Sequence, residues 1–126
     1  MADINGAWLG TYWQAGLPTR FEATLVQSGN SLTGNILDDG YLGEALITGS
    51  VTGRSIHFTK RYVISSPYVI EYAGTISEDE SFMTGEWKID YRHSGKWEAH
   101  RSGNSLIAEL QTRLEKPVVL AGSVEG

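Results

Sequence analysis

The sequence predicts an all-β fold, a single antiparallel up-and-down barrel of about eight strands with a short C-terminal helix. Three observations support this prediction. Apolar and polar residues alternate from Gly6 to about Arg101, as in strands with one buried face. Turn residues interrupt the alternation about every eight to twelve residues. Fifteen glycines, four tryptophans and six tyrosines fit tight turns between strands that carry large side chains.

Each alternating segment is expected to form one strand. The segments span about residues 6–13, 19–27, 31–37, 43–51, 55–62, 68–77, 82–91 and 96–101. The separators between them, such as Ser28-Gly29-Asn30 and His93-Ser94-Gly95, have hairpin length, which favours sequential antiparallel neighbours and excludes parallel crossover helices. Because an open sheet would leave two unpaired edges, closure of the first strand on the last is favoured over a sandwich.

The alternation also predicts which side chains point into the barrel. From the fifth strand onward, the inward set is Ile56, Phe58, Lys60, Tyr62, Tyr68, Ile70, Tyr72, Gly74, Ile76, Met83, Gly85, Trp87, Ile89, Trp97, Ala99 and Arg101. Glycines recur on the inward faces, at Gly10, Gly34, Gly49, Gly74 and Gly85. A missing side chain at these positions lets a strongly twisted strand curve.

The pattern changes after Arg101. Leu106, Ile107, Leu110 and Leu114 recur at helical spacing, and Pro117 follows as a stop. A helix is therefore expected over about 104–115, and a single domain over 1–126 with its barrel at about 6–101. The apolar stripe of this helix must cover the barrel wall, one barrel end or a second subunit. In the last case Leu106, Leu110 and Leu114 would form a homo-oligomer contact.

Composition narrows the function classes. Fifteen acidic and ten basic residues give a net charge of −5, which disfavours nucleic-acid binding. The chain has no cysteine, so disulfides, thiolate metal sites and cysteine nucleophiles are excluded. The first residues have neither a basic start nor an apolar run, and no later stretch reaches transmembrane length. A soluble cytoplasmic protein with no membrane contact is expected.

The start of the first strand and the end of the eighth carry a family resemblance. Gly6-Ala7-Trp8 together with Arg101 resembles the signature of the calycin superfamily of lipocalins, fatty-acid-binding proteins and avidins. The resemblance implies that Trp8 lies across a closed barrel end and that Arg101 packs over it, as a structural pair. The six residues from Gln14 to Thr19 are too few for the helical lid of fatty-acid-binding proteins, so a cavity would be open or covered by a partner.

Lys60 is the first candidate for a binding role, because it shares the inward phase of apolar residues and a buried lysine needs a partner. It would anchor an anion or a carboxylate, with Tyr62 and Tyr72 as hydrogen-bond donors and an apolar wall of Trp87 and Trp97. In the alternative, Lys60 reaches the rim or pairs with a carboxylate such as Glu71. The aromatic residues would then be ordinary core, and the barrel would be filled.

No catalytic or metal motif is present in the sequence. His57, His93 and His100 are spread over separate segments, so no metal site is expected. Glu78, Asp79 and Glu80 are expected in a hydrated turn. Neither an enzyme nor a cofactor is therefore predicted.

The leading hypothesis is a non-enzymatic barrel that binds a small, partly apolar ligand, either hydrophobic or carboxylate-bearing. Two alternatives stay open. One is a filled-barrel interaction or oligomerisation module that uses the C-terminal stripe. The other is a small barrel enzyme that acts at an open mouth, with Lys60 or a tyrosine as acid or base.

Overall fold

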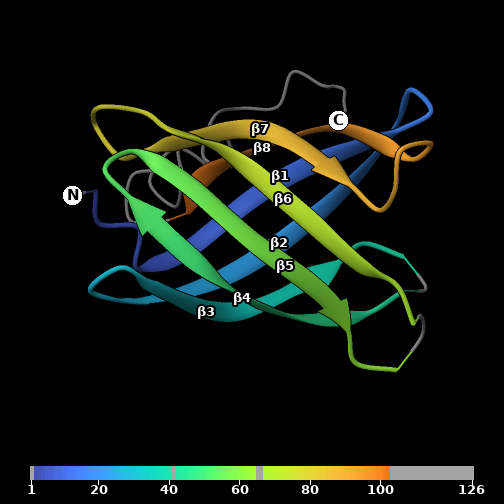
Figure 1. Cartoon of the computed structure of the whole chain (residues 1–126), viewed down its shortest axis with the longest axis horizontal. Helices are drawn as coiled ribbons and strands as arrows, with labels where there is room; N and C mark the ends of the chain where they lie inside the picture. The colour runs from blue at the N-terminus through green and yellow to red at the C-terminus, as the bar shows by residue number, and fades with distance from the viewer. Residues whose placement is uncertain (1, 41, 65–66, 103–126) are drawn as a thin grey trace, which may run out of the picture.

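The computed structural model describes residues 2–40, 42–64 and 67–102, and these residues form a closed antiparallel barrel in which the strands follow one another in chain order (Figure 1). The strands are β1 (Gly6–Gln14), β2 (Leu17–Ser28), β3 (Ser31–Asp38), β4 (Glu44–Thr52), β5 (Ser55–Tyr62), β6 (Val69–Ile76), β7 (Phe82–Lys88) and β8 (Ser94–Ser102). β1 pairs with both β2 and β8, which closes the barrel. The predicted up-and-down barrel is confirmed.

The connection between β1 and β2 is tighter than the sequence predicts. It is a hairpin whose central residues, Ala15 and Gly16, have φ values of 51° and 80°. Positive φ at both central positions is typical of a type I′ turn, whose twist matches that of the flanking strands. Alanine is not a typical turn residue. The sequence therefore predicts strands that end at Trp13 and begin again at Thr19, whereas the observed strands extend to Gln14 and from Leu17.

Two other strand limits also differ from expectation. β7 ends at Lys88 because Asp90 accepts hydrogen bonds from the backbone N–H groups of Arg92 and His93 and so forms a turn. β6 begins at Val69, and Tyr68, expected inward, is 59% exposed. Both differences lie at the same end of the barrel, where loops replace the outer parts of the expected strands.

Alternating apolar side chains form one buried core inside the barrel. Burial follows period two along the strands, as in β5 with its sequence of exposed and buried positions. The largest fully buried hydrophobic side chains are Trp8, Trp97, Tyr72, Ile4, Leu32, Ile36, Ile56, Ile76 and Val51. Within the described residues, no helix is long and apolar enough to cross a membrane.

The chain segment before β1 covers one end of the barrel. Ile4 is fully buried there, its N–H donates to Gln27 at 2.9 Å, and its carbonyl accepts the Trp8 indole N–H at 3.0 Å. The guanidinium of Arg101 lies 4.6 Å from the ring centroid of Trp8. It donates to the carbonyls of Asp3, Asn5 and Glu80. This arrangement makes one end of the barrel a closed end.

The C-terminal helix expected over 104–115, with its stripe of Leu106, Leu110 and Leu114, lies outside the described residues. The described chain ends with β8, whose last residues run beside the start of β1, as the register pair of Arg101 and Trp8 shows. The loops between β1 and β2, β3 and β4, β5 and β6, and β7 and β8 lie at the barrel end opposite the covering segment (Figure 1).

Candidate functional site

A cavity of about 440 Å³ opens at the loop end of the barrel. We call it the mouth cavity. Its lining is mostly aromatic and aliphatic, with polar groups at the rim: Tyr12, Gln14, Leu42, Tyr62, Pro67, Tyr68, Ile70, Tyr72, Trp87, Ile89, Asp90 and His93. A volume in this range, an apolar wall and a few polar groups are the usual features of small-molecule sites.

An ion pair lies inside the barrel next to the mouth cavity. The ammonium of Lys60 donates to both carboxylate oxygens of Asp38, at 2.8 and 3.0 Å. The two side chains are only 0% and 1% exposed, and neither lines the mouth cavity. Lys60 therefore pairs with a carboxylate in the interior, but the carboxylate is Asp38. Glu71, the partner considered from the sequence, lies 3.8 Å from His57, and both of these side chains are more than half exposed.

Asp38 was missed as a site residue because it stands in an Asp-Asp-Gly run that resembles a turn. Its place in the alternation of buried and exposed positions along the strand identifies it as an inward residue. Asp38 is the last residue of β3 and continues the buried positions Leu32 and Ile36. β4 lies between β3 and β5 in the sheet, so the ion pair with Lys60 joins two strands that do not pair directly.

Two tyrosines complete the hydrogen bonding of Asp38. The hydroxyls of Tyr12 and Tyr62 both donate to its Oδ2 oxygen, the first at 3.1 Å. The Lys60 ammonium also lies 4.7 Å from the ring centroid of Tyr12 and 4.8 Å from that of Tyr62. Both cation–π contacts and hydrogen bonds therefore hold the ion pair, as a buried charge pair requires.

Burial changes the proton affinity of these groups. It lowers the pKa of Lys60 below its usual value, and Asp38 acts in the opposite direction. Burial is also the first cause that raises the pKa values of Tyr12, Tyr62 and Tyr72, and the negative charge of Asp38 adds to it. These tyrosines therefore stay protonated well beyond neutral pH, and they can act as hydrogen-bond donors.

Tyr72 lines the mouth cavity and carries a buried hydroxyl. Its ring stacks on Phe58 with centroids 4.8 Å apart, and the residue is 2% exposed. Within the described residues, no hydrogen bond from its hydroxyl is found, although Asp38 and Lys60 lie nearby. A buried polar group without a partner is uncommon in a folded protein, so this hydroxyl is notable.

The two tryptophans of the expected apolar wall lie at different depths. Trp87 lines the mouth cavity, and its indole N–H donates to the carbonyl of Trp13 at 3.0 Å. Trp97 does not line this cavity. It packs edge-on against Phe58 and Tyr72. The structure therefore places Tyr62, Tyr72 and Trp87 around one cavity, Lys60 beside it, and Trp97 in the core next to Tyr72.

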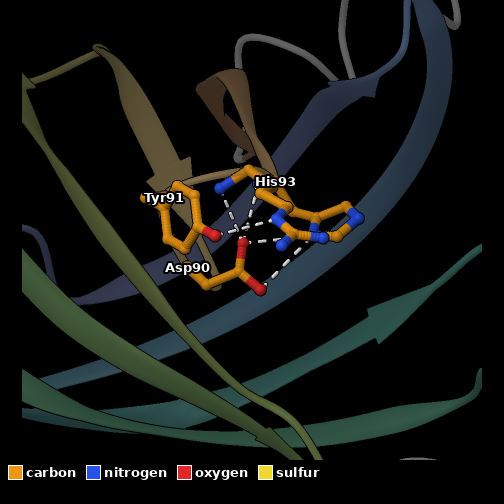
Figure 2. A network of polar contacts seen from close by, with 4 residues as sticks. Asp90, Tyr91 and His93 are labelled. Atoms are coloured by element: carbon orange, nitrogen blue, oxygen red, sulfur yellow. Dashed lines mark hydrogen bonds and ion pairs between the residues drawn. The ribbon is translucent and has the colours of Figure 1, made fainter.

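The turn between β7 and β8 contributes the polar rim. Figure 2 shows the Asp90 carboxylate facing His93, whose backbone N–H and Nδ1 lie 2.9 and 3.1 Å from Asp90 Oδ1. The Arg92 backbone N–H donates to the same oxygen at 2.8 Å, and it is the first cause that lowers the pKa of Asp90. Asp90 is thus a carboxylate at neutral pH, and it places a negative charge at the rim of the mouth cavity.

In the described parts of the chain, no group of three or more histidine or acidic side chains is placed to hold a metal ion. No protein-family model matches the chain, and no curated protein is found to match it. The barrel and the geometry of its mouth are therefore the basis for inferring function.

Proposed function

We propose that this chain is a calycin-like barrel that binds a small, largely apolar molecule in the mouth cavity without catalysing a reaction. The observation that carries the proposal is the cavity itself. It has a volume of about 440 Å³, and its wall includes Tyr12, Ile70, Tyr72 and Trp87. The volume and the apolar wall suit a small organic ligand.

The closed end supports the calycin-like assignment. Trp8 lies buried beneath the covering segment, and the Arg101 guanidinium lies over its ring at 4.6 Å. This is the arrangement that the resemblance implies. A barrel closed at one end and hollow at the other is suited to holding a ligand rather than passing one through.

The buried ion pair supports the non-enzymatic part of the proposal. A catalytic acid or base must reach the reacting atom within hydrogen-bonding distance. Lys60 and Asp38 bind each other, are almost fully buried, and do not line the cavity.

The test is a titration with N-phenylnaphthylamine, a neutral fluorophore whose emission rises in an apolar site. Ile70 lines the cavity on β6, and its neighbour Val69 is 37% exposed on the outer surface. Ile70→Trp should fill the cavity and abolish saturable binding, whereas the matched control Val69→Trp should bind as the original protein does. If the folded protein gives no saturable signal, or if Ile70→Trp binds normally, the proposal fails.

Native mass spectrometry of the protein from its own host provides a second test. A ligand held in the barrel adds mass to each subunit. A clean ligand-free mass in a defined oligomer would instead favour the interaction module, with Leu106, Leu110 and Leu114 as its contact.

A further inference from the structure

We propose that the mouth cavity selects uncharged aromatic ligands that carry a carbonyl or amide group, and that it rejects the corresponding carboxylates. This inference rests on the proposed function and names the chemical class of its ligand. It differs from the anionic ligand considered from the sequence, because the cation that would have bound an anion already has a carboxylate partner.

Lys60 already has a counter-charge within the protein. Its ammonium donates to both oxygens of Asp38 at 2.8 and 3.0 Å, so the pair has no net charge. The remaining space around the ammonium is taken by the rings of Tyr12, Tyr62 and Tyr72, with centroids 4.7, 4.8 and 5.7 Å away. A ligand anion could reach Lys60 only by displacing Asp38, which would leave the aspartate charge buried without a partner.

The charge of the cavity wall also disfavours anions. Among the lining residues that the structure describes, none is lysine or arginine. The charged group at the rim is Asp90, which repels anions, and His93 beside it already contacts the Asp90 carboxylate at 3.1 Å. A ligand carboxylate would therefore lose its hydration in the cavity without gaining a cation.

The hydrogen-bond groups along the wall favour a neutral acceptor. The hydroxyl protons of Tyr12 and Tyr62 go to Asp38, and the Trp87 indole N–H goes to Trp13. The hydroxyl of Tyr72 has no hydrogen-bond partner among the described residues, although the residue is 2% exposed. With respect to the described part of the chain, this donor is available to a neutral acceptor, such as a carbonyl oxygen.

The aromatic wall determines the rest of the ligand. Tyr12 and Trp87 pack at 78° with centroids 6.3 Å apart, and both line the cavity with Tyr72. Flat ring faces favour a planar aromatic body.

The experiment compares three compounds with the same ring system, naphthalene, naphthamide and naphthoate, by displacement of N-phenylnaphthylamine at neutral pH. Naphthamide should bind at least about tenfold more tightly than naphthoate, because only the acid brings an unpaired charge. Tyr72→Phe should weaken naphthamide about threefold to tenfold and leave naphthalene unchanged. Tyr91→Phe is the matched control, because Tyr91 is 89% exposed and does not line the cavity.

Tyr72→Phe also has a readout that does not depend on ligand. Because it removes a hydroxyl that has no hydrogen-bond partner among the described residues, it should not lower the midpoint of thermal unfolding. Naphthoate binding as tightly as naphthamide, or equal weakening of naphthamide and naphthalene by Tyr72→Phe, would overturn the inference while N-phenylnaphthylamine binding still supported the proposed function. If the fluorophore does not bind the folded protein either, the proposed function fails, and the inference fails with it.

Discussion

The ammonium of Lys60 and the carboxylate of Asp38 form an ion pair that crosses the inside of the barrel, with Nζ 2.8 Å from Oδ1. The two residues come from β5 and β3, and β4 separates these strands in the sheet. A buried ion pair gains little net stability over well-packed apolar residues, because both charges lose their hydration. The ion pair instead fixes local geometry, because Asp38 accepts hydrogen bonds from Tyr12 and Tyr62 and so orients both side chains beside the mouth cavity.

Asp38→Asn should lower the free energy of unfolding by about 3–5 kcal/mol, because it leaves the buried Lys60 ammonium without a counter-charge. Lys60→Met should be costly for the same reason, since Asp38 then lacks its cation. The double variant Asp38→Asn, Lys60→Met contains neither charge and should recover most of the loss. Urea denaturation of the four proteins measures the coupling. Additive costs of the two single changes would show that the pair does not interact as described.

Tyr12, Tyr62 and Tyr72 should resist ionisation in alkaline solution. Burial is the first cause that raises their pKa values above the ordinary value of 10.0. The second cause is the charge of Asp38 for Tyr12 and Tyr72, and the hydrogen bond to Asp38 for Tyr62. Above about pH 10 the unfolded chain releases phenolic protons that the folded protein retains, so stability falls as pH rises. Phenolate absorbance should therefore fall short of the value for all six tyrosines until the protein unfolds.

Lys60 has the opposite effect on the pH dependence of stability, and it acts at lower pH than the tyrosines. Burial lowers its pKa below the ordinary value of 10.5, so between the lowered pKa and 10.5 the unfolded chain binds more protons and stability rises with pH. Lys60→Met should remove this rise and keep the alkaline fall caused by the tyrosines.

A full phenolate signal from the folded protein near pH 10 would contradict the buried positions of the three tyrosines.

Arg101→Lys should loosen the closed end. The guanidinium donates to the carbonyls of Asn5 and Asp3, both at 2.7 Å, and to that of Glu80 at 2.9 Å. A lysine ammonium cannot reach three carbonyls with the geometry of this planar group. We expect a loss of about 2–4 kcal/mol in the free energy of unfolding, with faster hydrogen exchange at the Ile4 amide.

The control for Arg101 is Arg92→Lys. Arg92 lies in the exposed β7–β8 turn, with its guanidinium 5.3 Å from the ring of Tyr91. Its replacement should change stability by less than about 0.5 kcal/mol. Equal effects of the two changes would mean that the Arg101 hydrogen bonds do not hold the N-terminal segment in place.

The barrel could be predicted from sequence because each strand has one buried face, and that requirement produces a period of two that is visible without a structure. The inward phase of Lys60 and Trp87 was predictable on the same basis, and both are buried. The structure was needed for the partner of Lys60. Asp38 lies twenty-two residues away along the chain, and only the closed sheet brings its carboxylate to the ammonium.

The depth of each inward side chain along the barrel axis could not be predicted from sequence either. Alternation assigns Trp87 and Trp97 to the same inward class, but it does not show how far each lies along the barrel axis. In the folded chain Trp87 lines the mouth cavity, and Trp97 packs in the core against Phe58. The depth of a side chain depends on strand tilt and register, which involve all the strands together.

Gly85→Ala should be among the most damaging small substitutions in the barrel. A Cβ at this position would clash with the carbonyl oxygen of Ala73 and lie 2.5 Å from the Gly74 Cα, so β6 and β7 would have to separate. We expect a loss of at least about 3 kcal/mol in the free energy of unfolding, measured by urea denaturation.

Gly53→Ala is the comparison for Gly85→Ala, because it tests the conformational freedom of a glycine where no neighbouring backbone lies close. Gly53 has a φ of +60°, and nothing lies within 4 Å of a Cβ built there, so alanine should cost only about 1–2 kcal/mol of conformational strain. A larger effect at Gly85 than at Gly53 would show that the strand glycine is needed for the contact between neighbouring backbones. Equal effects would instead mean that β6 and β7 can move apart easily, and the curvature of the barrel would then need a different cause.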